Sequence, residues 1–171
     1  MGRQRKMVKF SMPRRAPTHF HANTALLLRL LAEAYEKKTW HGPNLKQSLR
    51  GVSARAAIWR PQRGRHNIWE LTIHAAYWKY VARRRLLGEK RGSFSVKGSN
   101  WLAAPKSASE SAWRELRQLL ETEHRKLIAA VTDPRNTALV RKHTKMILGV
   151  AFHDIYNTGQ ICLLHRMQNR G

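Results

Sequence analysis

The sequence is poor in cysteine and in long apolar runs. Cys162 is its single cysteine, so no disulfide can form within the chain, and a reducing compartment such as the cytoplasm is expected. No apolar stretch approaches the roughly 18–20 residues that span a bilayer, and the basic N-terminus lacks the apolar region of a secretory signal. We therefore expect a cytoplasmic protein that has no membrane partner.

Acidic residues are also scarce. Ten Asp and Glu stand against 33 Lys and Arg, which gives a formal net charge of +23. Such a positive field attracts nucleic acids, anionic membranes and acidic small molecules. However, the basic residues are spread over the chain, and neither a helix-turn-helix nor an aromatic and basic stacking surface is visible. A basic solvated surface explains the charge as well, so nucleic-acid binding ranks behind the alternatives below.

Alternation of apolar and polar residues, which is typical of strands, is absent from the whole chain. Apolar residues recur instead at three- and four-residue spacing, which predicts amphipathic helices. The length of 171 residues suits one domain. We predict a basic flexible arm over residues 1–18, where six basic residues and two prolines show no helical or strand periodicity, followed by one domain over residues 19–171.

Four segments carry the helical pattern, at about 20–37, 67–87, 107–133 and 135–167. Capping boxes are predicted where Asn67 precedes Glu70 and where Ser107 precedes Glu110.

The connections differ in length. Short helical turns are expected over 44–59, the second of them opening at Ser53. The glycine- and serine-rich segment 88–105 predicts a long surface crossover. The fold class that we predict is therefore all-α, a four-helix bundle with a long crossover between the second and third long helices.

Two histidines lie on predicted core faces. His74 shares a helix face with Leu71 and Trp78, so its side chain should point inward. His153 and Asn157 are four residues apart, the spacing by which one helix offers two ligands to a metal ion. A buried histidine that is hydrogen-bonded to its neighbours is the alternative for His74. The remaining histidines outside the motifs are expected at the surface or rim: His19, His21, His124, His143 and His165.

Three segments resemble the DinB-like family of DNA-damage-inducible four-helix-bundle proteins. The first runs from His66-Asn67-Ile68-Trp69-Glu70-Leu71 through His74 to Gly88, and it is similar to the second helix of the family. The second is His153-Asp154-Ile155-Tyr156-Asn157-Thr158-Gly159-Gln160-Ile161, which is similar to the fourth-helix signature. The third is Trp40-His41-Gly42-Pro43, and together they extend the resemblance over roughly residues 20–166.

The resemblance implies a bundle that often forms a homodimer and holds a divalent metal, usually zinc or nickel. By position, the ligands would be His74, His153 and residue 157. The chain has Asn157 where the family pattern has histidine, and an amide oxygen is a poorer ligand for these metals than imidazole. His41, in the loop before the second long helix, is then a candidate for an additional ligand.

Three further residues of the last helix have two interpretations. Tyr156 and Gln160 flank the ligand face, where they could orient a ligand by hydrogen bonding or simply pack at the bundle edge. Gly159 should weaken the helix, which predicts a compensating close approach of another helix or room for a substrate.

Members of the family with an assigned activity resemble thiol-dependent S-transferases or hydrolases. The first hypothesis is therefore a metal-dependent transferase of the thiol S-transferase type, or a hydrolase, that uses a low-molecular-weight thiol and an unknown small-molecule substrate. The second is a catalytically decayed, metal-free bundle that acts as a binding or dimerisation module. The third is nucleic-acid binding through the basic surface.

Overall fold

Helices are the main secondary structure of the part that the computed structural model describes, residues 19–168. The predicted arm over 1–18 lies outside the described residues, and no strand occurs within them. Nor is any of the helices in residues 19–168 long and apolar enough to cross a membrane. The elements are α1 (His19–Tyr35), α2 (Leu45–Ser48), α3 (Ala54–Ile58), α4 (Ile68–Leu87), α5 (Glu110–Thr132), the 3₁₀ turn η1 (Pro134–Asn136), α6 (Thr137–Lys142) and α7 (Thr144–Gln168).

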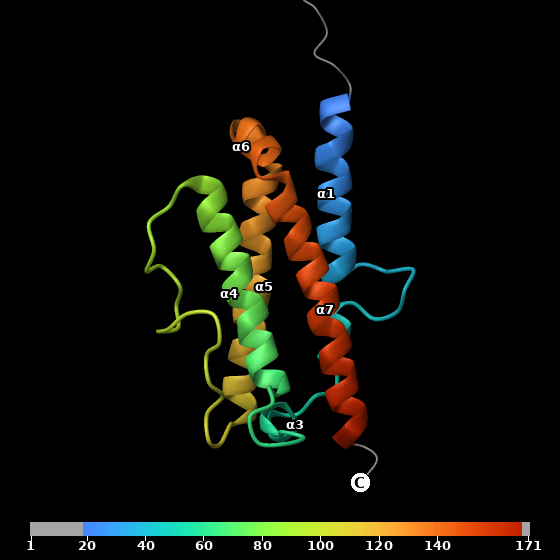
Figure 1. Cartoon of the computed structure of the whole chain (residues 1–171), viewed down its shortest axis with the longest axis vertical. Coiled ribbons are helices and arrows are strands. Elements are labelled where there is room, and N and C mark those ends of the chain that lie inside the picture. Colours follow the sequence, from blue (N-terminus) through green and yellow to red (C-terminus); the bar gives the residue numbers. More distant parts are fainter. Residues whose placement is uncertain (1–18, 169–171) are drawn as a thin grey trace, which may run out of the picture.

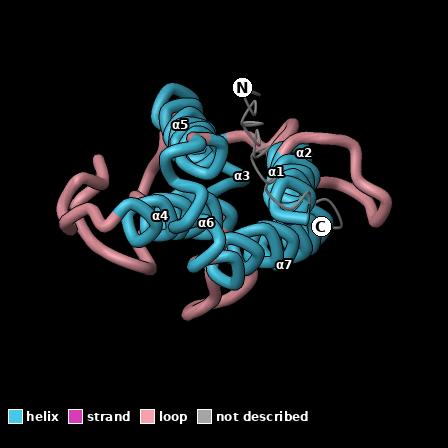
Figure 2. Tube along the Cα trace, turned by 90° about the horizontal axis from the view of Figure 1, so that it is seen from above, coloured by secondary structure: helices cyan, strands magenta, loops and turns pink. Residues whose placement is uncertain are grey.

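The four long helices form a bundle. Figure 1 shows α1 and α7 running in one direction and α4 and α5 in the other. Seen from above, α4 lies between α5 and α7, and α1 lies beside α7 (Figure 2). Because α4 and α5 are parallel neighbours, the segment 88–109 has to return along the length of the bundle. The predicted fold class, an all-α helical bundle, is confirmed.

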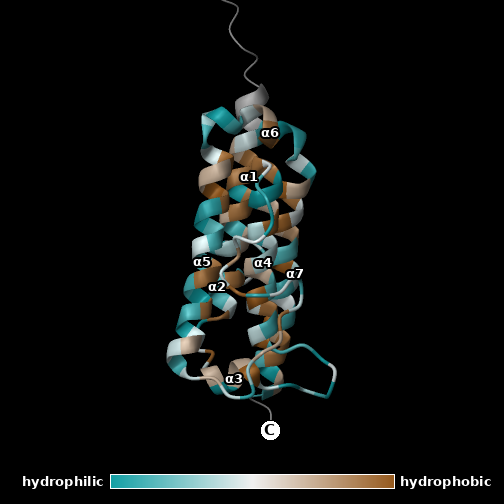
Figure 3. Ribbon diagram, turned by 90° about the vertical axis from the view of Figure 1, so that its left-hand side faces the viewer, coloured by the Kyte–Doolittle hydropathy of each residue, from teal (hydrophilic) through white to brown (hydrophobic). Residues whose placement is uncertain are grey.

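The core consists of two apolar clusters along the bundle axis. Trp113, Leu71 and Ile161 belong to one of them, and Leu127 and Ile147 belong to the other; all five are fully buried. Brown apolar segments gather where the helices face one another in Figure 3, and teal segments lie outside. This inward arrangement of the helical apolar faces is what aligns α4 with α7.

A polar layer is buried between the two clusters. Lys79 of α4 and Asp154 of α7 form an ion pair, and both side chains are fully buried. The Lys79 ammonium also lies 5.1 Å from the centroid of the Tyr35 ring.

His124 of α5 belongs to the same layer, since its ring stacks on that of Tyr35 at a centroid distance of 4.0 Å. The prediction that His124 lies at the surface is wrong. It shares the inner face of α5 with Leu120 and Leu127, so it is fully buried. Neither of its ring nitrogens has a hydrogen-bond partner among the described residues.

Replacing His124 with phenylalanine should stabilise the protein. An unpaired buried polar group costs about 1–3 kcal/mol, and the phenyl ring keeps the stack on Tyr35. Burial, followed by the charges of Lys79 and Arg125, lowers the pKa of His124 to about 2. Below about pH 6.5 the His124 imidazole therefore binds a proton in the unfolded chain but stays neutral in the folded protein.

The stabilisation by His124→Phe should consequently grow by about 1.4 kcal/mol for each pH unit below 6.5. Urea unfolding at pH 7, 6 and 5 measures it. A stabilisation that does not change with pH would mean that His124 is already protonated, or hydrated, in the folded protein.

The ends of the helices differ in part from the prediction. The Asn67 side chain accepts a hydrogen bond from the backbone N–H of Glu70 at 2.9 Å, as expected. The other half of the predicted capping box is not formed, because the Glu70 carboxylate binds Arg60 and the crossover instead of the backbone of Asn67. The cap of α5 is Ser109 rather than Ser107, and Glu110 instead accepts a hydrogen bond from the backbone N–H of Ala54 at 2.7 Å. The side chain of Glu110 therefore ties α5 to α3.

The fourth predicted helix is divided. The chain leaves the helical conformation at His143, where ψ is 17°, so that α6 and α7 replace the continuous helix expected over 135–167.

Gly159 lies on the exposed side of α7. A Cβ atom built there would meet no atom within 4 Å, so no other helix approaches it closely, and the expected compensation by packing is absent. We predict that Gly159→Ala raises the free energy of unfolding by about 1 kcal/mol, because alanine reduces the conformational freedom of the unfolded chain. Thermal or urea unfolding at a protein concentration low enough to keep the chain monomeric measures this, and a destabilised variant would contradict the open space around Gly159.

Candidate functional site

The site lies where α4 and α7 face each other. His74 from the second turn of α4 and His153 from the middle of α7 point toward each other, with 3.0 Å between their Nε2 atoms. The ring centroids are 4.9 Å apart. The structure thus brings together two of the residues that the sequence pattern singled out.

Asn157 joins this pair from one turn further along α7. Its amide nitrogen lies 3.2 Å from Nδ1 and 3.4 Å from Nε2 of His153, and the side chain is 1% exposed. A half-turn of the amide exchanges its nitrogen and oxygen atoms. The same position can therefore present either a donor or an acceptor to the imidazole.

The orientation of His74 is set by the crossover. Its Nδ1 lies 3.0 Å from the backbone carbonyl oxygen of Asn100. A carbonyl only accepts hydrogen bonds, so Nδ1 carries the proton and the lone pair is on Nε2, which faces His153. This is the hydrogen bond that commonly orients a metal-binding histidine.

Trp101 also restrains the His74 ring, by stacking on its face. The Trp101 indole stacks on His74 at 3.7 Å and on His66 at 3.6 Å, with interplanar angles of 2° and 7°. The three rings form one stack, which restricts rotation of the His74 imidazole.

Glu70 fixes the crossover to α4 below this stack. Its carboxylate accepts hydrogen bonds from Arg60, from the backbone N–H of Ala104 at 3.2 Å and from Nδ1 of His66 at 3.1 Å. Burial alone would raise the pKa of Glu70, but the hydrogen bonds from Arg60 and His66 outweigh it and hold the pKa at about 2. Glu70 is therefore ionised at neutral pH and anchors the segment that carries Asn100 and Trp101.

Both imidazoles of the pair are neutral at pH 7. Burial lowers the pKa of His153 to about 4, and the charges of His74 and Lys79 act in the same direction. Burial also lowers the pKa of His74, which the hydrogen bond to Asn100 only partly opposes. Neutral imidazole is the form that binds metal ions.

A cavity of about 510 Å³ opens beside the pair. Arg85, at its edge, is the one side chain in its lining that is charged at neutral pH. The other lining groups that matter for chemistry are His74, His153, Trp78, Trp101 and Tyr156. The cavity can therefore hold a small molecule that combines an apolar body with an anionic group.

Of the remaining candidate residues, Asn157, His41 and Gln160 do not line this cavity, whereas Tyr156 does. His41 is exposed in the loop over 36–44, and it is not among the residues that line the cavity. Gln160 is half-buried on α7 and does not line it either. Tyr156 does line it, although its side chain is 69% exposed.

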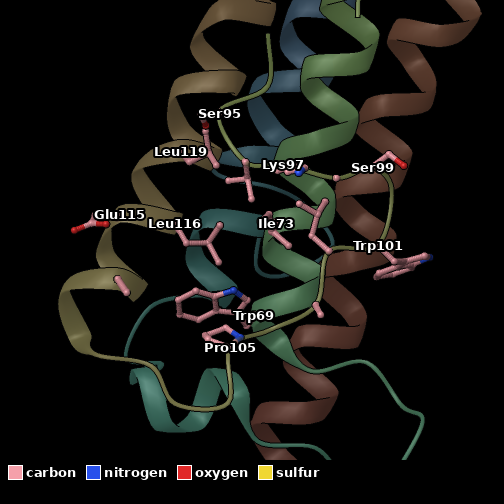
Figure 4. Close-up of a pocket in the computed structure, with 15 residues that line it drawn as sticks. Trp69, Ile73, Ser95, Lys97, Ser99, Trp101, Pro105, Glu115, Leu116 and Leu119 are labelled. Carbon is pink, nitrogen blue, oxygen red and sulfur yellow. The ribbon is translucent and has the colours of Figure 1, made fainter. Parts of the chain in front are cut away.

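A larger cavity of about 800 Å³ lies on the other side of α4, against α5. Figure 4 shows Trp69, Leu116 and Leu119 around it, while Trp101 points away, toward α7. Its lining is mainly apolar and contains no histidine. Of these two cavities, only the smaller is lined by the histidine pair.

Sequence reasoning missed Asn100 and Trp101. Both lie in the crossover, where no helical periodicity reports which way a side chain points. A large aromatic residue within a segment rich in glycine and serine was the one available signal for Trp101.

The two imidazoles fit a metal ion. At a metal–nitrogen distance of about 2.0–2.1 Å, two ligands stand about 2.9 Å apart at a right angle and about 3.3 Å apart at the tetrahedral angle of zinc; the 3.0 Å between the Nε2 atoms lies within this range. Residues 19–168 contain no cluster of three His, Cys, Asp or Glu side chains that could hold a metal. A third protein ligand would therefore have to be the amide oxygen of Asn157.

Comparison with known proteins places the chain in a family. No curated protein and no solved structure matches the chain. A family model described as the DinB superfamily matches residues 38–171, which include α4, α7 and both histidines of the pair. With the helical bundle and its crossover, this match shows that the chain belongs to the DinB superfamily.

Proposed function

We propose that this protein is a metal-dependent enzyme, a transferase of the thiol S-transferase type or a hydrolase, with His74, His153 and Asn157 as its metal ligands. The observation that supports this most is the pair of neutral imidazoles whose Nε2 atoms lie 3.0 Å apart. One of them is oriented through Nδ1 by the carbonyl of Asn100. The metal would be zinc or nickel, since imidazole nitrogen suits both.

When bound, a divalent ion with an open coordination position lowers the pKa of a thiol or water and so supplies a nucleophile at neutral pH. The surrounding residues have separate roles. Trp101 and Asn100 hold the His74 ring in place, Trp78 and Tyr156 provide apolar walls, and Arg85 attracts an anionic group. A low-molecular-weight thiol or an anionic small molecule would enter from the side of Arg85, and the reducing cytoplasm that the single cysteine suggests would keep such a thiol reduced.

Metal content tests this proposal. Protein purified without a nickel column, then dialysed, should retain zinc or nickel well above about 0.2 equivalents. His153→Ala should lose it. His165→Ala is the matched control because His165 also lies on α7, is half-buried and lines no cavity at the site. Less than about 0.2 equivalents in the parent protein, also after reloading with zinc, would reject the proposal.

A second candidate function is a metal-free binding module. The observation that favours it is a chain of hydrogen bonds that closes without an ion. In that state the amide of Asn157 donates to Nδ1 of His153, Nε2–H of His153 donates to His74, and His74 donates to the carbonyl of Asn100. Every polar atom of the pair then has a partner, which a histidine at position 157 would not provide in the same way.

We also propose that the protein forms a homodimer through the exposed face of α7. This face carries Phe152, Ile155, Tyr156, Leu163 and Met167, each between 38% and 69% exposed. Apolar side chains repeated along one helix face are typical of a helix that packs on a partner.

Leu163→Asp should shift such a dimer to monomer in sedimentation experiments at about 20 µM protein, because it would bury an unpaired carboxylate. The charge-matched control is Thr132→Asp at the end of α5, where the side chain is exposed. A parent protein that sediments as a monomer would reject the homodimer.

A further inference from the structure

A second chamber adjoins the cavity of the histidine pair. It has a volume of about 580 Å³ and lies between the outer side of α4 and the crossover, which projects from the bundle in Figure 1. Both hollows are lined by Trp78, Arg85 and Asn100. The hydrogen bond from Nε1 of Trp78 to the side-chain oxygen of Asn100, 3.1 Å long, forms the partition between them.

The chamber is strongly basic. Its charged lining residues are Arg84, Arg85, Arg91 and Lys97, and no acidic residue lines it. Arg84 donates to the backbone carbonyl of Glu89 at 3.0 Å. Arg85, Arg91 and Lys97 form no hydrogen bond or ion pair within residues 19–168, so their charges are available to a ligand. Cations converging on a concave surface concentrate their field there.

The floor of the chamber is aromatic. Phe94 from the crossover packs edge-on against Tyr77 at 5.4 Å and lies 5.3 Å from Tyr80. The Tyr80 hydroxyl accepts a hydrogen bond from the backbone N–H of Gly92 at 3.2 Å. These contacts hold the crossover against α4, and they leave Trp78 and Tyr77 half-buried along the wall.

We propose that this chamber binds the anionic group, a phosphate or a carboxylate, of a small ligand that carries an aromatic ring. Arg91, Lys97 and Arg85 bind the anion, and the ring contacts Tyr77 and Trp78. Because Trp78, Arg85 and Asn100 line both the chamber and the cavity of the histidine pair, a molecule bound at this shared edge could also contact His74 and His153. The inference that the chamber forms part of a substrate site rests on the proposed function. The inference that the chamber binds an anion does not depend on it.

Calorimetric titration of the metal-free protein at an ionic strength of about 0.15 M, where charges more than about 8 Å apart are largely screened, tests the chamber. Phenyl phosphate should bind about tenfold more tightly than inorganic phosphate, since the ring adds apolar contact, and phenol should not bind measurably. Benzoate compared with phenyl phosphate distinguishes a carboxylate from a phosphate as the preferred group. The double variant Arg91→Ala/Lys97→Ala should weaken phenyl phosphate at least about tenfold.

The matched control is the double variant Arg141→Ala/Lys142→Ala on α6. It also removes one exposed arginine and one exposed lysine, and neither residue lines the chamber. It should change the affinity by less than about twofold, as expected for a distant charge that salt screens. Both double variants should bind zinc with the same affinity, because neither changes a proposed ligand. If the parent protein binds phenyl phosphate but no metal, only the enzymatic proposal is rejected.

Three results would overturn the inference. One is the absence of phenyl phosphate binding at millimolar concentration, and another is an equal loss of affinity in both double variants, which would assign the binding to the general positive field. The third is tighter binding of a short single-stranded oligonucleotide than of phenyl phosphate, together with competition between the two. This result would make the chamber part of a nucleic-acid surface.

Discussion

Replacing Lys79 with methionine should lower the free energy of unfolding by about 3–5 kcal/mol, because it leaves the carboxylate of Asp154 buried without its counter-ion. Both side chains are fully buried. Asp154 Oδ1 has no hydrogen-bond partner among the described residues, so the pair provides most of what stabilises this charge. Burial raises the pKa of Asp154, which Lys79 opposes. Methionine has nearly the length of lysine, so the loss would report the charge rather than a cavity.

The double variant Lys79→Met/Asp154→Leu separates the charge from the packing. Since replacement of a buried ion pair by apolar residues is often neutral, the double variant should be within about 1 kcal/mol of the parent. Urea unfolding at pH 7 measures all three proteins. A single variant that loses less than about 1 kcal/mol would indicate that water reaches the pair and that this part of the core is not dry.

Asn157→His should tighten zinc binding about 100-fold. The free energy of a four-ligand zinc site, about 10–16 kcal/mol, corresponds to roughly 3 kcal/mol for each ligand, which is about two orders of magnitude in affinity. The new imidazole would replace an amide that lies within 3.4 Å of Nε2 of His153. Competition with a chromogenic chelator at pH 7.5 measures the affinity.

Gln160→His is the control for this gain. It adds a histidine to the same helix, at a half-buried position that does not line the cavity, so it should leave the affinity unchanged. A parent that binds no zinc beside an Asn157→His variant that does would favour the metal-free module over the enzyme. Equal affinity of the parent and Asn157→His would contradict the convergence of position 157 with the two imidazoles.

The two proposals for the site depend on one side chain. With its oxygen turned toward the pair, Asn157 would complete the set of three metal ligands of the proposed enzyme. With its nitrogen turned there, it completes a hydrogen-bonded network in which no ion is needed. An amide can serve in both ways because its two ends differ in hydrogen bonding and hardly in shape. A histidine at position 157 would favour metal binding over the metal-free network.

The sequence by itself determined the helical class, the long crossover and the inward direction of His74 and His153. These properties follow from local rules: the 3.6-residue period, the helix-breaking residues and the i, i+4 spacing each depend on a few neighbouring residues. The family resemblance extended this to the pairing of the second and fourth long helices. Capping was predicted correctly at Asn67, where the signal is local.

Only the tertiary structure decided how the site is completed. Asn100 and Trp101 reach His74 because Glu70 and Phe94 fasten the crossover to α4, and such contacts between distant segments leave no periodic signal in the sequence. The same holds for His124, whose side chain turned out to be buried beside Tyr35 and Lys79. Side chains in a loop, or polar side chains on an inner helix face, acquire their partners from packing, and packing depends on the whole chain.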